Sequence, residues 1–187
     1  MGSIMNQRRW ACLTLALLWV GISVTGKTVR LSDNWLVASA AVAGNDGRVL
    51  STSDADTNGW LQARVPSTIM GVLSKNGLDS CSSDSWWYRT MFALPSIKND
   101  EHVLLQFDGI SYRADIWLNG RKIAGKKQTY GPFRQFCFDI TDAVSKNNVL
   151  AVEVFKAQPG EPNIGYVDWN PRPGDESMGL FREVSIK

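Results

Sequence analysis

Short segments in which apolar and polar residues alternate dominate this chain and restrict what it can fold into. The alternation is clearest in 114–118 and 136–140, and apolar or β-branched runs cover 86–92, 103–107 and 149–155. A period of two residues places one face of a strand against a core and the other toward solvent. Many short strands separated by turn residues predict an all-β protein, a jelly-roll β-sandwich.

Turn and cap residues refine this prediction. Asn119-Gly120 lies between two strand-like segments and predicts a type I′ hairpin, because both central residues of that turn need positive φ. The segment 180–186 is predicted to be the last strand. One short helix is expected between Thr68, which can cap it, and Gly77, which can end it. Its buried face would hold Ile69, Val72 and Leu73.

The first 26 residues are typical of a secretory signal peptide. Arg8 and Arg9 precede the apolar run 10–24, and small residues follow it up to Gly26. The run is shorter than the roughly 20 residues that a transmembrane helix needs. We therefore expect residues 1–26 to be removed, the mature chain 27–187 to form one domain, and the protein to be secreted or periplasmic. An uncleaved membrane anchor is the alternative.

Charge and rare residues exclude several classes of function. Without Arg8 and Arg9, basic and acidic residues are equal in number, and no basic cluster with interleaved aromatics occurs, so the sequence does not indicate nucleic-acid binding. His102 is the sole histidine and no metal-type ligand accompanies it, so neither a metal nor another cofactor is expected. Whether Cys81 and Cys137 form a disulfide stays open.

The run 166–184 is the strongest candidate for a functional site. It is too irregular for a helix and too polar for a core strand, and its prolines favour a stiff loop that displays Asp168 and Trp169. A carboxylate can accept hydrogen bonds from sugar hydroxyls, and an indole ring can cover the apolar face of a sugar. Arg172 and Asp175 are further candidate substrate-binding residues.

Eight stretches carry a resemblance to a known family: 65–69, 87–92, 107–112, 116–120, 131–133, 138–142, 148–152 and 178–184. In this order they resemble the N-terminal sugar-binding domain of glycoside hydrolase family two, which includes β-galactosidases, β-glucuronidases, β-mannosidases and exo-β-D-glucosaminidases. The Asp168-Trp169 run, followed by 178–182, is most similar to the mannosidase and exo-glucosaminidase branch.

The resemblance implies a role for the loop and a division of labour. In the family, a loop of this domain reaches the active site of a later catalytic barrel, and its acidic residue, best matched here by Asp168, bonds the terminal sugar. Both catalytic carboxylates lie on that barrel, the acid/base within an Asn-Glu dipeptide, which this chain lacks along with any βαβ alternation. We therefore expect no catalytic residue here.

The expected function is that of the N-terminal sugar-binding domain of a secreted exo-acting β-glycosidase, cut off before its C-terminal domains. The parent enzyme would hydrolyse terminal β-linked hexosides, with mannose or glucosamine as the sugar. A free-standing carbohydrate-binding module is the alternative, and it would need a closed site of its own with an aromatic platform. A structural domain without ligand affinity is the third hypothesis, and a loop-capping role is the alternative for Asp168.

Overall fold

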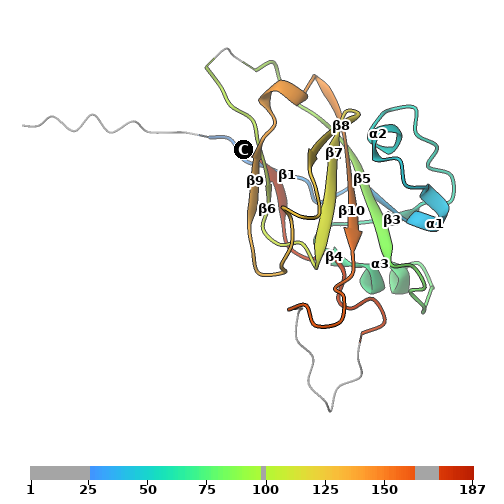
Figure 1. The fold of residues 1–187 in the computed structure, drawn as a ribbon. Coiled ribbons are helices and arrows are strands. Elements are labelled where there is room, and N and C mark those ends of the chain that lie inside the picture. The colour runs from blue at the N-terminus through green and yellow to red at the C-terminus, as the bar shows by residue number, and fades with distance from the viewer. Residues whose placement is uncertain (1–25, 98–99, 163–172) are drawn as a thin grey trace, which may run out of the picture.

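Two antiparallel sheets packed face to face form the body of the protein. The computed structural model describes residues 26–97, 100–162 and 173–187. The six-stranded sheet has the order β3-β2-β5-β10-β7-β8, and the four-stranded sheet has the order β1-β12-β6-β9 (Figure 1). The first consists of β2 (Trp35–Ser39), β3 (Leu61–Ala63), β5 (Ser85–Ala93), β7 (Arg113–Leu118), β8 (Arg121–Ala124) and β10 (Asn147–Phe155). The second consists of β1 (Val29–Arg30), β6 (Leu104–Phe107), β9 (Phe136–Asp139) and β12 (Val184–Ile186).

Small elements close the ends and one outer face of the sandwich. A two-stranded sheet, β4 (Ser67–Thr68) with β11 (Gly179–Leu180), lies beside α3 (Ile69–Lys75) at one end (Figure 1). The short helices α1 (Ala40–Ala43) and α2 (Gly47–Leu50) lie against the outer face of the six-stranded sheet. A single 3-10 turn, η1 (Thr141–Ala143), precedes β10. The predicted all-β sandwich is thereby confirmed.

The central strands alternate between two apolar clusters. Leu150, Val152 and Val154 of β10 lie in the main core between the sheets, whereas Ala151 belongs to a smaller cluster on the outer face. That smaller cluster also contains Ala38, Leu50, Trp60 and Trp87, so the segment that carries α1 and α2 covers this face. Both faces of β10 are therefore buried over most of its length, which suits a central strand.

The local signals predicted from the sequence are confirmed. Asn119 and Gly120 have φ of 50° and 81°, as a type I′ turn requires. The side chain of Thr68 accepts a hydrogen bond from the amide of Gly71 and caps α3, and Gly77 follows the helix with φ of 74°. The buried face of α3 consists of Ile69, Val72 and Leu73.

The predicted last strand is divided between two sheets. Residues 179–180 pair with β4, whereas 184–186 pair with β6 and β1. Between them, the amide of Asp108 donates to the carbonyl of Glu183 over 2.9 Å. The segment thus leaves the end of the sandwich and enters the four-stranded sheet. Cys81 and Cys137 are both free, and Cys137 is exposed on β9.

Candidate functional site

The candidate loop leaves the sandwich where β10 ends and returns at β11. Its described flanks are residues 156–162 and 173–178, which emerge beside α3 and β4 at one end of the molecule (Figure 1). Three of the predicted sugar contacts, Asp168, Trp169 and Arg172, lie outside the described residues. The structure therefore defines where the loop starts and ends and what holds these two points.

Asp175, the fourth predicted contact, is buried in the returning flank. Its exposed fraction is 2%, and its Oδ2 accepts a hydrogen bond from the amide of Met70 over 2.8 Å. Oδ1 accepts from the amide of Ser177 over 2.9 Å. Met70 lies in the first turn of α3, whose amides have no partner inside the helix, so the carboxylate caps the helix together with Thr68. Asp175 thus joins the loop to α3.

The sequence contains a signal for the turn that begins at Asp175. Asp175 stands two residues before Ser177, the spacing at which an aspartate accepts from the backbone and forms a turn. Glu176 and Ser177 both have positive φ, at 53° and 56°, within that turn. The contact with Met70 spans 105 positions and needed the fold to be recognised.

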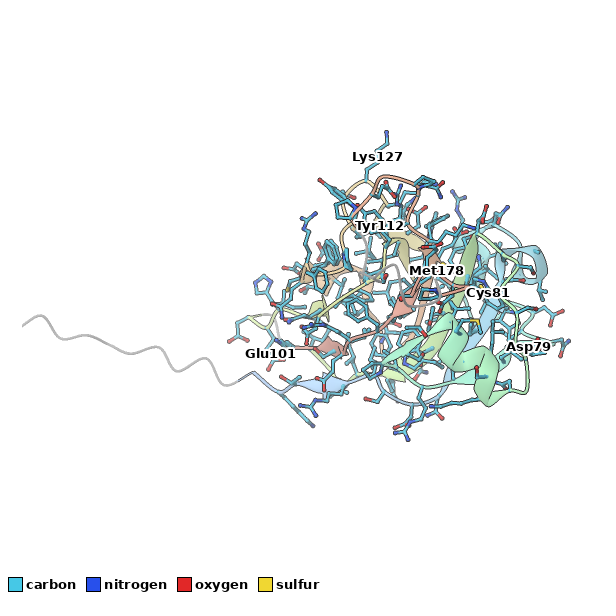
Figure 2. All side chains as sticks on the ribbon, turned by 90° about the horizontal axis from the view of Figure 1, so that it is seen from below. Asp79, Cys81, Glu101, Tyr112, Lys127 and Met178 are labelled. Carbon is cyan, nitrogen blue, oxygen red and sulfur yellow. The ribbon has the colours of Figure 1, made fainter. Side chains whose placement is uncertain are left out.

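The return to the sheet depends on a glycine. The carbonyl of Met178 accepts from the amide of Ile69 over 2.8 Å, and Gly179 then adopts φ of 150°. A Cβ at Gly179 would lie 2.5 Å from the carbonyl oxygen of Ser67 and 2.7 Å from the hydroxyl of Tyr88, closer than atoms approach. Figure 2, which views this end from below, shows Met178 between Tyr112 and Cys81. Only glycine lets the chain pass here.

The outgoing flank is held by ion pairs. Glu161 pairs with Arg113, whose guanidinium also lies 4.9 Å from the ring centre of Tyr112. Closer to β10, Lys156 pairs with Asp84 at the start of β5, and this hydrogen bond raises the pKa of the lysine. The two flanks are therefore attached to different parts of the sandwich, one through ion pairs between side chains and the other through a carboxylate that accepts from backbone amides.

Buried polar groups beneath the flanks serve as scaffold. Tyr88 is fully buried and donates its hydroxyl to the carbonyl of Ser67 over 3.0 Å. Burial raises the pKa of this phenol, so it stays protonated and keeps donating. Chemically, the described part of the site can position a loop firmly, and the groups that could touch a ligand are those expected within 163–172.

The described ranges 26–97, 100–162 and 173–187 bear on two classes of function, metal binding and membrane insertion. No cluster of three or more His, Cys, Asp or Glu side chains there is arranged to hold a metal ion. No helix in those ranges combines the length and the apolar character required to span a bilayer.

The chain is similar to part of several glycosidases. Exo-β-D-glucosaminidase of Hypocrea jecorina is 34% identical over 82% of this chain, and that of Amycolatopsis orientalis is 31% identical over 82%. A mannosylglycoprotein endo-β-mannosidase of Lilium longiflorum is 30% identical over 86%. The chain spans 19%, 16% and 21% of these three proteins, respectively.

Solved structures agree with this assignment. An exo-chitosanase of Amycolatopsis orientalis, crystallised with PNP-β-D-glucosamine, superposes with a TM-score of 0.72 at 29% identity, over 87% of this chain and 20% of the enzyme. A β-glucuronidase of Bifidobacterium dentium shares the fold, with a TM-score of 0.64 at 21% identity, over 86% of this chain and 29% of that protein. The family model for the glycosyl hydrolase 2 galactose-binding domain-like fold matches residues 48–164. The chain therefore belongs to the glycosyl hydrolase 2 galactose-binding domain-like family.

Proposed function

We propose that this chain is the N-terminal sugar-binding domain of a secreted exo-acting β-glycosidase that hydrolyses terminal β-linked hexosides, with glucosamine as the first candidate sugar and mannose as the second. One observation carries the proposal: exo-β-D-glucosaminidases match 82% of the chain, while the chain covers 16–19% of their length. The catalytic acid/base and nucleophile would then belong to the C-terminal domains of the same enzyme.

Within that enzyme, the loop would supply substrate contacts. Asp168 would accept hydrogen bonds from hydroxyls of the terminal sugar, Trp169 would cover its apolar face, and Arg172 would add a donor. The fixed flanks support this arrangement, because a contact residue is effective only when its loop is held in place. Asp175 would contribute by capping α3, which anchors the returning flank.

A domain exchange tests the proposal. Residues 27–187 would replace the matching segment of the Hypocrea jecorina exo-β-D-glucosaminidase, and hydrolysis of an aryl β-D-glucosaminide would be measured. We expect activity, and we expect Asp168→Ala in the chimera to lower kcat/KM by about 2–3 kcal/mol of transition-state stabilisation, the cost of losing a hydrogen bond to a charged group. A loss of thermal stability with kcat/KM unchanged would assign Asp168 to loop capping instead.

The chain by itself should hydrolyse neither aryl β-glycosides nor chitosan oligomers above the buffer rate. A free-standing carbohydrate-binding module would also be inactive, so the two functions are separated by the chimera, whose activity requires docking to catalytic domains. Turnover by residues 27–187 alone, lost on substitution of a single acid, would overturn the proposal.

We also propose that the protein is exported and that its first 26 residues are removed. Expression of residues 1–187 in a secreting host should yield a product that begins near Lys27. N-terminal sequencing of the exported protein checks this, and retention of Met1 or Gly2 on a membrane-bound product would contradict it.

A further inference from the structure

A groove lies at the end of the sandwich opposite the loop flanks. Strand β10 connects the two ends, with Asn147 at the groove and Phe155 at the loop, roughly 26 Å apart at about 3.3 Å per residue. The cavity volume of the groove is about 660 Å³. Its lining comes from Ser51–Ser53, Met91–Ala93, Asn119, Ser145 and Asn147–Val149.

The groove lacks charge. None of the described residues that line it is acidic or basic, although 20% of the residues in the chain are charged. Hydroxyl and carboxamide groups form its walls instead. A ligand would therefore be recognised through neutral hydrogen bonds and apolar contact, since no wall offers an ion pair to a phosphate, a carboxylate or a free cation.

The floor of the groove is apolar and open. Met91 and Val149 are direct partners in the register between β5 and β10, on the outer face of the six-stranded sheet. Met91 keeps an exposed fraction of 54%, whereas Val149 is buried at 6%, so the thioether of Met91 forms the open part of the floor. A flexible, polarisable thioether can adapt to an apolar surface such as the C–H face of a sugar ring.

The wall hydroxyls already donate hydrogen bonds to acceptors within the protein. Thr52 Oγ1 donates to the carbonyl of Val49 over 2.8 Å, and Ser145 Oγ donates to the carbonyl of Asn147 over 2.6 Å. Ser53 Oγ donates to Asp54 over 3.0 Å. What each hydroxyl still offers is acceptor lone pairs, so a matching ligand must bring donors.

Asn147 supplies the complementary group. Its side chain is exposed, and among the residues that the structure describes its carboxamide has no hydrogen-bond partner. A carboxamide both donates and accepts, so it can bind a hydroxyl in either direction. The groove thus combines several acceptors with one group that offers both functions.

Both walls are held rigidly before any ligand binds. Arg89 donates to the carbonyls of Leu50 and Thr52 over 3.1 and 2.8 Å and fixes the first wall. Asn148 is fully buried, and its Oδ1 accepts from the amide of Ser145 and from Nδ2 of Asn119 over 2.7 and 2.8 Å, which fixes the second. A preformed groove loses little entropy on binding.

We propose that this groove is a second saccharide-binding site, specific for uncharged sugars. A sugar donates from many hydroxyls and presents an apolar C–H face, which matches acceptor-rich walls above a thioether floor. The site goes beyond the proposed function, because it lies at the other end of the sandwich from the loop and needs no catalytic domain.

The test is an NMR titration of the isotope-labelled chain. Cellotetraose, mannotetraose and tetra-N-acetylchitotetraose serve as neutral probes, and tetragalacturonate serves as the charged comparison. We expect saturable shifts of the amides in 51–53, 91–93 and 145–149 with at least one neutral probe, in the millimolar range, and weaker binding of tetragalacturonate. Absence of saturable shifts in these segments with every neutral probe, or equal binding of tetragalacturonate, would overturn the proposal.

Variants locate the site and separate it from the loop. Asn147→Ala should weaken binding about three- to tenfold, the effect of losing one hydrogen bond, and Met91→Ala should weaken it as well. Asn45→Ala, an exposed asparagine outside the groove, is the matched control and should have no effect. Asp168→Ala should leave this binding unchanged while it impairs the chimera. If Asp168→Ala abolishes binding and Asn147→Ala does not, the groove proposal is wrong and the loop binds the sugar.

Discussion

The two faces of the six-stranded sheet are built from the same strands but bury different kinds of side chain. On the inner face, Leu150, Val152 and Val154 meet the four-stranded sheet in an apolar core. On the outer face, the alternate positions of β5 and β10 include Arg89 and Glu153, both nearly buried. The inner face is mainly apolar, with few polar groups such as the Tyr88 hydroxyl, whereas the outer face also buries charged groups that need partners.

Arg89 is a buried charged group of the outer face whose hydrogen-bond partners come from the covering segment. The alternation along β5 favours a guanidinium at the sheet surface, paired with a carboxylate. In the structure the covering segment carries α2, and Arg89 donates to the carbonyls of Leu50 and Thr52 instead. These carbonyls lie at the C-terminal end of α2, where the helix leaves acceptors without partners. The outer face is thus completed by a charged residue that caps a helix.

The largest expected effect tests the inner face. Leu150→Ala should lower the free energy of unfolding by about 2–5 kcal/mol, because it opens a cavity in a fully buried site. Met91→Ala on the outer face should change it by less than about 0.5 kcal/mol, since that side chain is largely exposed. Urea denaturation measures both, and similar costs for the two would contradict the distinction between the faces.

Arg89→Met should be the next most damaging change. It keeps most of the side-chain volume but leaves two carbonyls without donors, at a cost of about 2–3 kcal/mol. Hydrogen exchange should rise first in 47–52, the segment that Arg89 holds. If Arg89→Met matches the wild type in denaturation and exchange, water replaces the guanidinium and the covering segment is held by apolar contacts alone.

Trp87→Phe should cost about 1 kcal/mol through its lost hydrogen bond, and the smaller ring adds the cost of a cavity because Trp87 is fully buried. The ring stays apolar, but the indole Nε1 no longer donates to the carbonyl of Gly44 at the end of α1, a bond of 2.9 Å. Thermal denaturation with Trp87→Phe and Arg89→Met, alone and combined, gives the coupling between them. Additive effects would mean that α1 and α2 are held independently, whereas coupling would show that the covering segment acts as one unit.

The smallest effect concerns pH. Burial raises the pKa of Glu153 above its ordinary 4.5, the Ser85 hydroxyl opposes this by donating over 2.8 Å, and Asp115 across the strand adds to it. A raised folded-state pKa means that the contribution to stability is present below the unfolded pKa and lost as pH rises through the folded one. Glu153→Gln should therefore gain stability relative to the wild type from pH 4.5 upward, as measured by thermal denaturation across pH. An advantage that shrinks with rising pH would contradict the assignment.

Much of the fold and little of the site followed from local patterns. Sequence patterns predicted the strands in 86–92, 103–107, 114–118, 136–140 and 149–155, the Asn119-Gly120 hairpin and the helix capped by Thr68. They did not predict β1 to β4, nor the helices α1 and α2. The segment 40–50, which carries α1 and α2, has no sustained 3.6-residue pattern. These short helices are stabilised by contacts with the sheet beneath them and not by their own sequence. For the loop, the sequence predicted candidate residues, but the capping role of Asp175 appeared only with α3 beside it.

What the sequence by itself determined is therefore the set of elements whose signals lie within a few residues: alternation, turn residues and caps. The tertiary structure decided which sheet each strand joins, why 180–186 divides between two sheets, and which partners Arg89 and Asp175 find. The physical reason is that alternation states only that a strand has a buried face, whereas the partner of a buried polar group comes from a distant part of the chain. The hydrogen bond between Asp175 and Met70 forms only after folding brings these two distant residues together.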